Sequence, residues 1–250
     1  MKRVMMIPLL FFTVCSCVLA QKALEPAVYG NYACDSKDAF GQYYNEKKTK
    51  LLHLNRLSCG VFLFPSVGYE GVLGYDSVKH VLVYNESIKN IWGQAYEEVY
   101  EIAKTKDNSM YHTLRDKPKN QWAIPVVYHQ MRISDDLASD LQELWTNAIS
   151  AAREDASQVV ALDGTSYDVF VRGSQPMYAR TNGCANNRAP EGQEYLVRRL
   201  LKLNRQLIEA VKKGNRRALE ALRIDIKFLA DDFGHDAAAV ESSKMFRHAF

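Results

Sequence analysis

Four stretches of the chain carry apolar residues at three- and four-residue steps, which is the spacing of amphipathic helices. They predict helices over residues 87–103, 134–153, 190–213 and 216–232. The second is the best defined, because Ser134 is a good N-cap and a stripe from Leu137 to Ala152 lies on one face. Ser87 is the expected N-cap of the first helix, and Gly214 the expected end of the third.

Runs of β-prone residues are interspersed with these helices. They predict strands over residues 60–64, 80–84, 122–128, 159–162, 166–171 and 177–180. Asp163-Gly164 is typical of a tight hairpin between the fourth and fifth runs, and Pro125 places the third run at a sheet edge or a bulge. The glycine-rich residues 67–76 are expected to form a loop, whereas residues 51–54 begin either a strand or a short helix.

The order of these elements predicts an α+β fold. An antiparallel sheet, built from a hairpin and a meander, is expected to pack against amphipathic helices and to be followed by a C-terminal helix pair. The expected organisation is a signal peptide over residues 1–20, an α+β domain over 21–189, a helical pair over 190–233 that packs on it, and a tail over 234–250.

The first twenty residues have the composition of an export signal. Lys2 and Arg3 precede an apolar run, and Val18-Leu19-Ala20 suits a cleavage site. We therefore expect a periplasmic or extracellular protein whose mature chain has no transmembrane span. Val14-Cys15-Ser16-Cys17 also resembles a bacterial lipobox, so an envelope lipoprotein anchored at Cys17 is the alternative.

Composition and charge place the chain among ordinary globular proteins. It has 250 residues, of which 47% are hydrophobic and 24% are charged, enough to bury a sizeable core. The formal net charge of +3 gives no electrostatic basis for binding nucleic acid or an anionic membrane.

Three cysteines remain after removal of residues 1–20, and an odd number leaves one thiol over. Cys34 and Cys59 are closest in sequence and form the simplest disulfide. Cys184 is then a buried inert thiol, an intermolecular partner or a nucleophile.

Local signatures of catalysis are missing from the sequence. It has no G-x-S-x-G, phosphate-loop, dinucleotide-binding, H-E-x-x-H or C-x-x-C pattern, so the sequence predicts neither a metal site nor a cofactor. The candidate catalytic pair is Cys184, in a loop ahead of a helix, with His129 as its base.

The densest cluster of adaptable hydrogen-bonding groups follows the last predicted strand. The predicted binding residues are Arg180, Asn182, Asn186, Asn187 and Arg188. Together these features predict an exported protein-binding or accessory module whose partner is another protein. The alternative is a hydrolase or transferase whose catalytic residues meet only in three dimensions.

One part of the chain resembles a group of small exported bacterial proteins of uncharacterised function. The resemblance covers residues 134–213: a leucine-rich helix with a central Trp145, the sequence Leu162-Asp163-Gly164-Thr165-Ser166-Tyr167, a meander and a leucine-rich helix. It implies export and a bacterial source, and it implies no catalytic residue.

Overall fold

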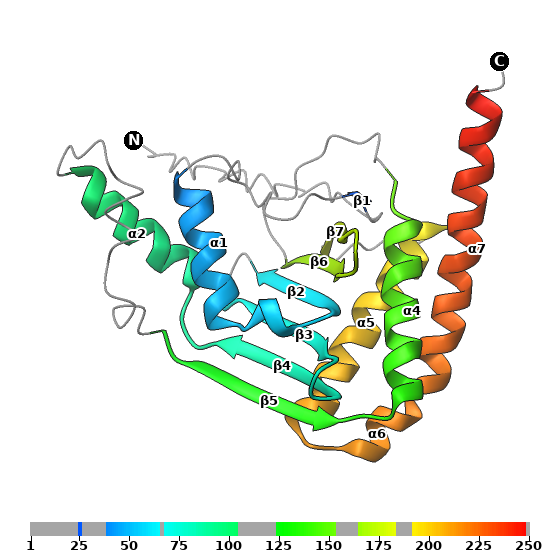
Figure 1. Cartoon of the computed structure of the whole chain (residues 1–250), viewed down its shortest axis with the longest axis horizontal. Helices are drawn as coiled ribbons and strands as arrows, with labels where there is room; N and C mark the ends of the chain where they lie inside the picture. The colour runs from blue at the N-terminus through cyan, green and yellow to red at the C-terminus, as the bar shows by residue number, and fades with distance from the viewer. Residues whose placement is uncertain are drawn as a thin grey trace, which may run out of the picture.

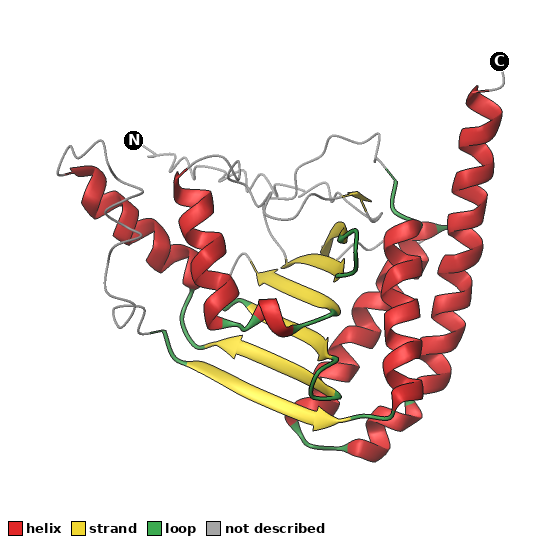
Figure 2. Ribbon diagram, viewed as in Figure 1, coloured by secondary structure: helices red, strands yellow, loops and turns green. Residues whose placement is uncertain are grey.

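An antiparallel sheet with helices on both faces forms the centre of the molecule (Figures 1 and 2). The computed structural model describes residues 25–26, 39–65, 68–104, 124–153, 165–183 and 192–248. The strands are β1 (Glu25–Pro26), β2 (Cys59–Pro65), β3 (Gly71–Asp76), β4 (Val81–Ser87), β5 (Val126–Arg132), β6 (Thr165–Val171) and β7 (Met177–Gly183). Their order across the sheet is β1-β7-β6-β2-β3-β4-β5, and every neighbouring pair is antiparallel. The predicted α+β class is confirmed.

The helices divide between the two faces of this sheet (Figure 1). They are α1 (Ala39–Leu51), the short 3₁₀ helix η1 (Leu54–Arg56), α2 (Ile91–Lys104), α4 (Asp135–Ser150), α5 (Gln193–Lys212), α6 (Arg216–Ala221) and α7 (Arg223–His248). Helices α1 and α2 cover one face, and α4, α5 and α7 cover the other. Within the described ranges, no helix combines the length and apolar character that crossing a bilayer requires.

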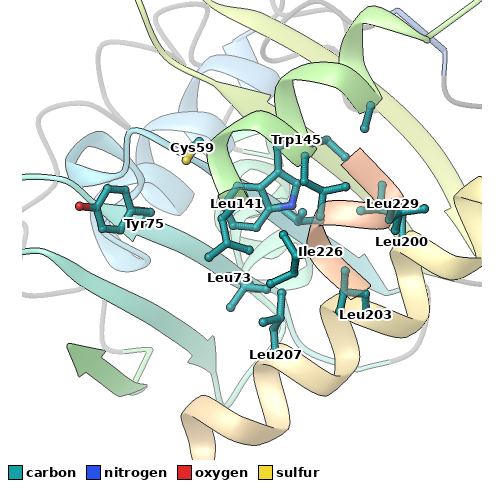
Figure 3. Close-up of a cluster of buried hydrophobic side chains, with 14 of the residues drawn as sticks. Cys59, Leu73, Tyr75, Leu141, Trp145, Leu200, Leu203, Leu207, Ile226 and Leu229 are labelled. Atoms are coloured by element: carbon teal, nitrogen blue, oxygen red, sulfur yellow. The ribbon is translucent and has the colours of Figure 1, made fainter. Parts of the chain in front are cut away.

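Alternation along the strands supplies a separate core to each face. In β2, Val61 points to the larger core, and its neighbour Phe62 points to the smaller one. The larger core is centred on the fully buried Trp145, with leucines of α4 and α5 and Ile226 and Leu229 of α7 around it (Figure 3). Residues of α5 and α7 therefore share this core with residues of the strands.

Several predicted elements are present nearly as expected. Ser134 caps α4 by accepting a hydrogen bond from the backbone N–H of Leu137 at 3.3 Å. Helix α5 ends just before Gly214, whose φ of 62° suits a residue without a side chain. Strand β5 lies at the sheet edge, as Pro125 indicated. The run at 159–162 and its Asp-Gly turn lie outside the described residues.

The loop predicted over residues 67–76 is wrong for its second half, which forms the interior strand β3. Its glycines serve close packing rather than a turn. A Cβ on Gly74 would lie 2.7 Å from the Leu57 side chain and 2.9 Å from the carbonyl oxygen of Cys59. Glycine is needed where neighbouring chain approaches this closely, and the same residue type misleads a prediction from composition.

Two helical segments were not predicted. Helix α1 carries no apolar stripe, because its buried face combines Tyr43 and Tyr44 with Lys47 and Lys48. Helix α7 continues from Arg223 to His248, through the predicted tail. It packs mainly along α4 and also contacts α5, while α5 and α6 form the predicted C-terminal helix pair (Figure 1).

Ser87 is not the N-cap of α2, which begins four residues later. It ends β4, and its hydroxyl donates to the carbonyl oxygen of Glu70 at 3.0 Å. The buried Glu70 carboxylate instead accepts hydrogen bonds from the backbone N–H groups of Ile91 and Trp92, each at 2.7 Å. A carboxylate at this position satisfies the otherwise unpaired donors of the first turn and the positive end of the helix dipole.

Candidate functional site

A pocket of about 240 Å³ lies beside η1, on the sheet face that α1 covers. Its walls come from η1, from the turn after β3, and from β4 and β5. Its polar lining includes His53, Arg56, Asp76, Lys79, Asn85 and Tyr128. This volume is somewhat below the ~300 Å³ of the smallest typical drug-sized sites, so it suits a small molecule.

His53 enters the pocket from a strained backbone position. It has φ 57° and ψ 34°, the left-handed region that non-glycine residues rarely adopt. Its imidazole stacks on the Tyr128 ring, with 4.9 Å between the ring centroids. Strain of this kind costs about 1–3 kcal/mol and is concentrated at functional sites.

Side chains from two strands hold this strained segment in place. The Tyr128 hydroxyl donates a hydrogen bond to the carbonyl oxygen of Leu51 at 3.0 Å. The Asn85 amide donates to the carbonyl oxygen of Leu52 at 2.8 Å. Because both acceptors lie at the end of α1, β4 and β5 fix the position from which His53 projects.

The turn on the opposite wall is fixed by Asp76. One oxygen of this buried carboxylate accepts hydrogen bonds from the backbone N–H groups of Val78 and Lys79, both at 3.1 Å. These bonds order the turn that carries the Lys79 side chain, a common role for aspartate in turns.

Positive charge converges on His53. Burial lowers the pKa of His53 below the usual 6.5, and the charges of Arg56 and Lys79 lower it further. Burial also raises the pKa of Tyr128, while Arg56 opposes that rise. Arg56 is therefore close enough to act on both rings, and His53 is neutral at pH 7.

Such an arrangement is suited to holding an anion. A guanidinium and an ammonium supply charge and donors, and the neutral imidazole supplies one further N–H donor. Across the described part of the chain, no group of three His, Cys, Asp or Glu side chains could hold a metal ion.

His129 also lines the pocket, but its ring stacks on a residue of the opposite sheet face. It is paired across the sheet with Tyr84, and the two rings stack with 6.5 Å between centroids. Tyr84 belongs to the core on the α5 side, so alternation leaves Tyr128 and Gln130 facing the pocket. Cys184, the predicted catalytic partner of His129, lies outside the described residues, so this catalytic pair stays a prediction.

Among the predicted binding residues, Arg180 has a described side chain. It lies in β7 and makes two hydrogen bonds to the Asp168 carboxylate, at 2.8 and 3.1 Å. Asn182 is also in β7. The remaining three, Asn186, Asn187 and Arg188, fall outside the described residues, so a shared binding loop stays a prediction.

Within the described residues, Cys59 in β2 is buried and forms no disulfide, and burial raises the pKa of its thiol to about 12. It is therefore an unreactive thiol at neutral pH. Cys34, its predicted disulfide partner, lies outside the described residues, and the bridge stays a prediction.

The sequence singled out one lining residue of the pocket, His129, but none of the side chains that would bind an anion there. His53, Arg56, Lys79 and Tyr128 come from separate segments, and no spacing along the chain links them. Comparison with protein-family models, with curated proteins and with solved structures finds no match to this chain. Function therefore has to be inferred from the chemistry of the pocket itself.

Proposed function

We propose that this protein is an exported binding protein that holds a small carboxylate- or phosphate-bearing molecule in the His53 pocket. Export is inferred from the signal-like residues 1–20. The observation that carries the ligand class is that two cationic side chains, Arg56 and Lys79, line the same pocket as the imidazole of His53.

The charge balance of the pocket supports an anionic ligand. Arg56 and Lys79 face one carboxylate, Asp76, which is already occupied by two backbone N–H groups. A bound anion would offset the remaining positive charge. Tyr128 and Asn85 are both hydrogen-bonded to main-chain carbonyl groups, so the segment that carries His53 is held in place before a ligand binds.

A protein partner, expected from the sequence, stays a prediction. Most of the residues assigned to it lie outside the described part of the chain. A small-ligand site and a protein partner are compatible, since the pocket uses none of the predicted loop residues.

Inorganic phosphate and acetate, titrated calorimetrically into the purified protein at pH 7 and constant ionic strength, test the proposal. We expect millimolar or tighter binding of at least one of them. Arg56→Ala and Lys79→Ala should each weaken that binding about tenfold, the usual worth of a hydrogen bond to a charged group.

Lys227→Ala is the matched control, because Lys227 is an exposed lysine on α7, away from the pocket lining. Its affinity should equal that of the parent protein. If neither anion binds, or if all three variants lose the same amount of affinity, the pocket is not an anion site.

A further inference from the structure

A second polar site lies under α1, around the side chain of Lys48. This lysine is 1% exposed. Its Nζ atom lies 4.7 Å from the centre of the Phe62 ring and 5.1 Å from that of Tyr44. The ammonium position is thus enclosed by aromatic faces, an environment that desolvates a charged group strongly.

A small cavity adjoins this amine. Its volume is about 20 Å³, and Lys48, Phe62, Asp168, Phe170, Arg172 and Tyr178 line it. Room for one water needs roughly 10–15 Å³, so the cavity admits a molecule of two or three heavy atoms and nothing as large as a sugar or an amino acid.

Strand pairing brings charged groups to the same place. Asp168 is opposite Phe62 in the β2–β6 register and opposite Arg180 in the β6–β7 register. Asp168 and Arg180 form a two-bond ion pair. Arg172 adds a second guanidinium, 5.7 Å above the Phe170 ring.

Burial disfavours an ammonium at Lys48, and among the described charges the Arg180 guanidinium adds to this effect. Burial is the main cause that lowers the pKa of Lys48 to about 7. The negative charges of Asp168 and Glu70 oppose the lowering, and the positive charge of Arg180 adds to it. A large fraction of the amine is therefore unprotonated and nucleophilic at neutral pH.

We propose that Lys48 is a carbon dioxide site, at which the amine takes up CO₂ as a carbamate. The Nζ lone pair attacks the carbon of CO₂, and a C–N bond forms. One C=O electron pair moves onto oxygen, and the nitrogen releases one proton to solvent. No oxidant, reductant or leaving group takes part.

Size and charge both select this ligand. CO₂ has three heavy atoms and no net charge, so it can reach a cavity of this volume without losing a hydration shell. The product carries one negative charge, and the guanidinium of Arg172 is among the described groups that line the cavity in which it would lie. Larger aldehydes and ketones would react with the same amine but exceed the cavity.

Lys47 is an internal control in the same helix. It is also fully buried, but its Nζ atom donates hydrogen bonds to the two carboxylate oxygens of Glu98, each at 2.9 Å. An ammonium held by a carboxylate stays protonated and does not add to CO₂.

The experiment exposes the purified protein to ¹³C-labelled CO₂ at pH 8, traps carbamates as ethyl esters with triethyloxonium, and maps them by peptide mass. We expect occupancy on Lys48 at least tenfold above that on Lys47 and on the exposed Lys202 and Lys227. The ¹³C carbamate resonance should disappear in Lys48→Arg, which keeps a long basic side chain.

The position-resolved map of the parent protein decides the question even if a variant folds poorly. No label on Lys48, or labelling of Lys48 no greater than that of the exposed lysines, would overturn the proposal. The result is independent of the anion pocket, because the two sites share no lining residue.

Discussion

Alanine at position 60 is expected to prevent stable folding. A Cβ on Gly60 would lie 2.2 Å from the carbonyl oxygen of Leu73 and 2.6 Å from the Cα of Gly74. Both atoms belong to the backbone of β3, so no side-chain rotation can relieve the contact. The β2–β3 pairing would have to separate, and this displaces Val61 from one core and Phe62 from the other. We expect a loss of about 4 kcal/mol or more in the free energy of unfolding.

Gly173→Ala is the control for this prediction. Gly173 lies between β6 and β7, and no atom comes within 4 Å of a Cβ placed there. Its free energy of unfolding should change by less than about 0.5 kcal/mol. Urea unfolding followed by circular dichroism measures both variants. If Gly60→Ala unfolds at the same urea concentration as the control, the close approach of β2 and β3 is wrong.

Lys48→Met is expected to stabilise the protein at neutral pH. Methionine keeps the unbranched stem and removes the amine that the folded state holds in an apolar setting. The pKa of this amine falls from 10.5 to about 7 on folding. By linkage, that shift lowers the free energy of unfolding of the parent protein by an amount on the order of 3–5 kcal/mol at pH 7. Lys48→Met has no amine at this position and does not incur this loss.

The sign of the pH dependence follows from the lowered pKa. Between pH 7 and pH 10.5 the unfolded chain binds more protons at Lys48 than the folded chain does, so the free energy of unfolding rises with pH. The gain in free energy of unfolding of Lys48→Met over the parent protein is therefore largest below pH 7 and declines toward pH 10.5.

Urea unfolding at pH 7 and pH 9.5 tests this difference, with Lys47→Met as the contrasting variant. Lys47→Met should destabilise the protein at both pH values, because it leaves the Glu98 carboxylate without its cation. Parallel pH profiles for the parent protein and Lys48→Met would refute the lowered pKa of Lys48.

Periodicity predicted the elements whose buried faces are apolar. Helices α4 and α5 follow their leucine stripes, and β2 follows its run of aliphatic and aromatic residues. It did not predict α1, because tyrosine and lysine make up much of that buried face. It also missed β3, because glycines that permit close strand packing resemble those of a loop.

The candidate site depends on tertiary register, which the sequence pattern does not carry. His129 was singled out as a catalytic base, yet Tyr128 is the strand residue whose ring faces the pocket. A shift of one position reverses the face, so only the observed β4–β5 pairing decides which side chain takes part. His53 gave no signal, because its importance lies in a strained backbone and in two cations from elsewhere in the chain.

Proton NMR titration of the His53 imidazole, assigned with His53→Gln, tests the anion pocket most directly. In phosphate-free buffer its pKa should lie below 6.5, and Arg56→Ala should raise it. Saturating phosphate should raise it in the parent protein, since a bound anion favours the imidazolium form. An imidazole that titrates at the same pH with and without phosphate, at matched ionic strength, would contradict the pocket as an anion site.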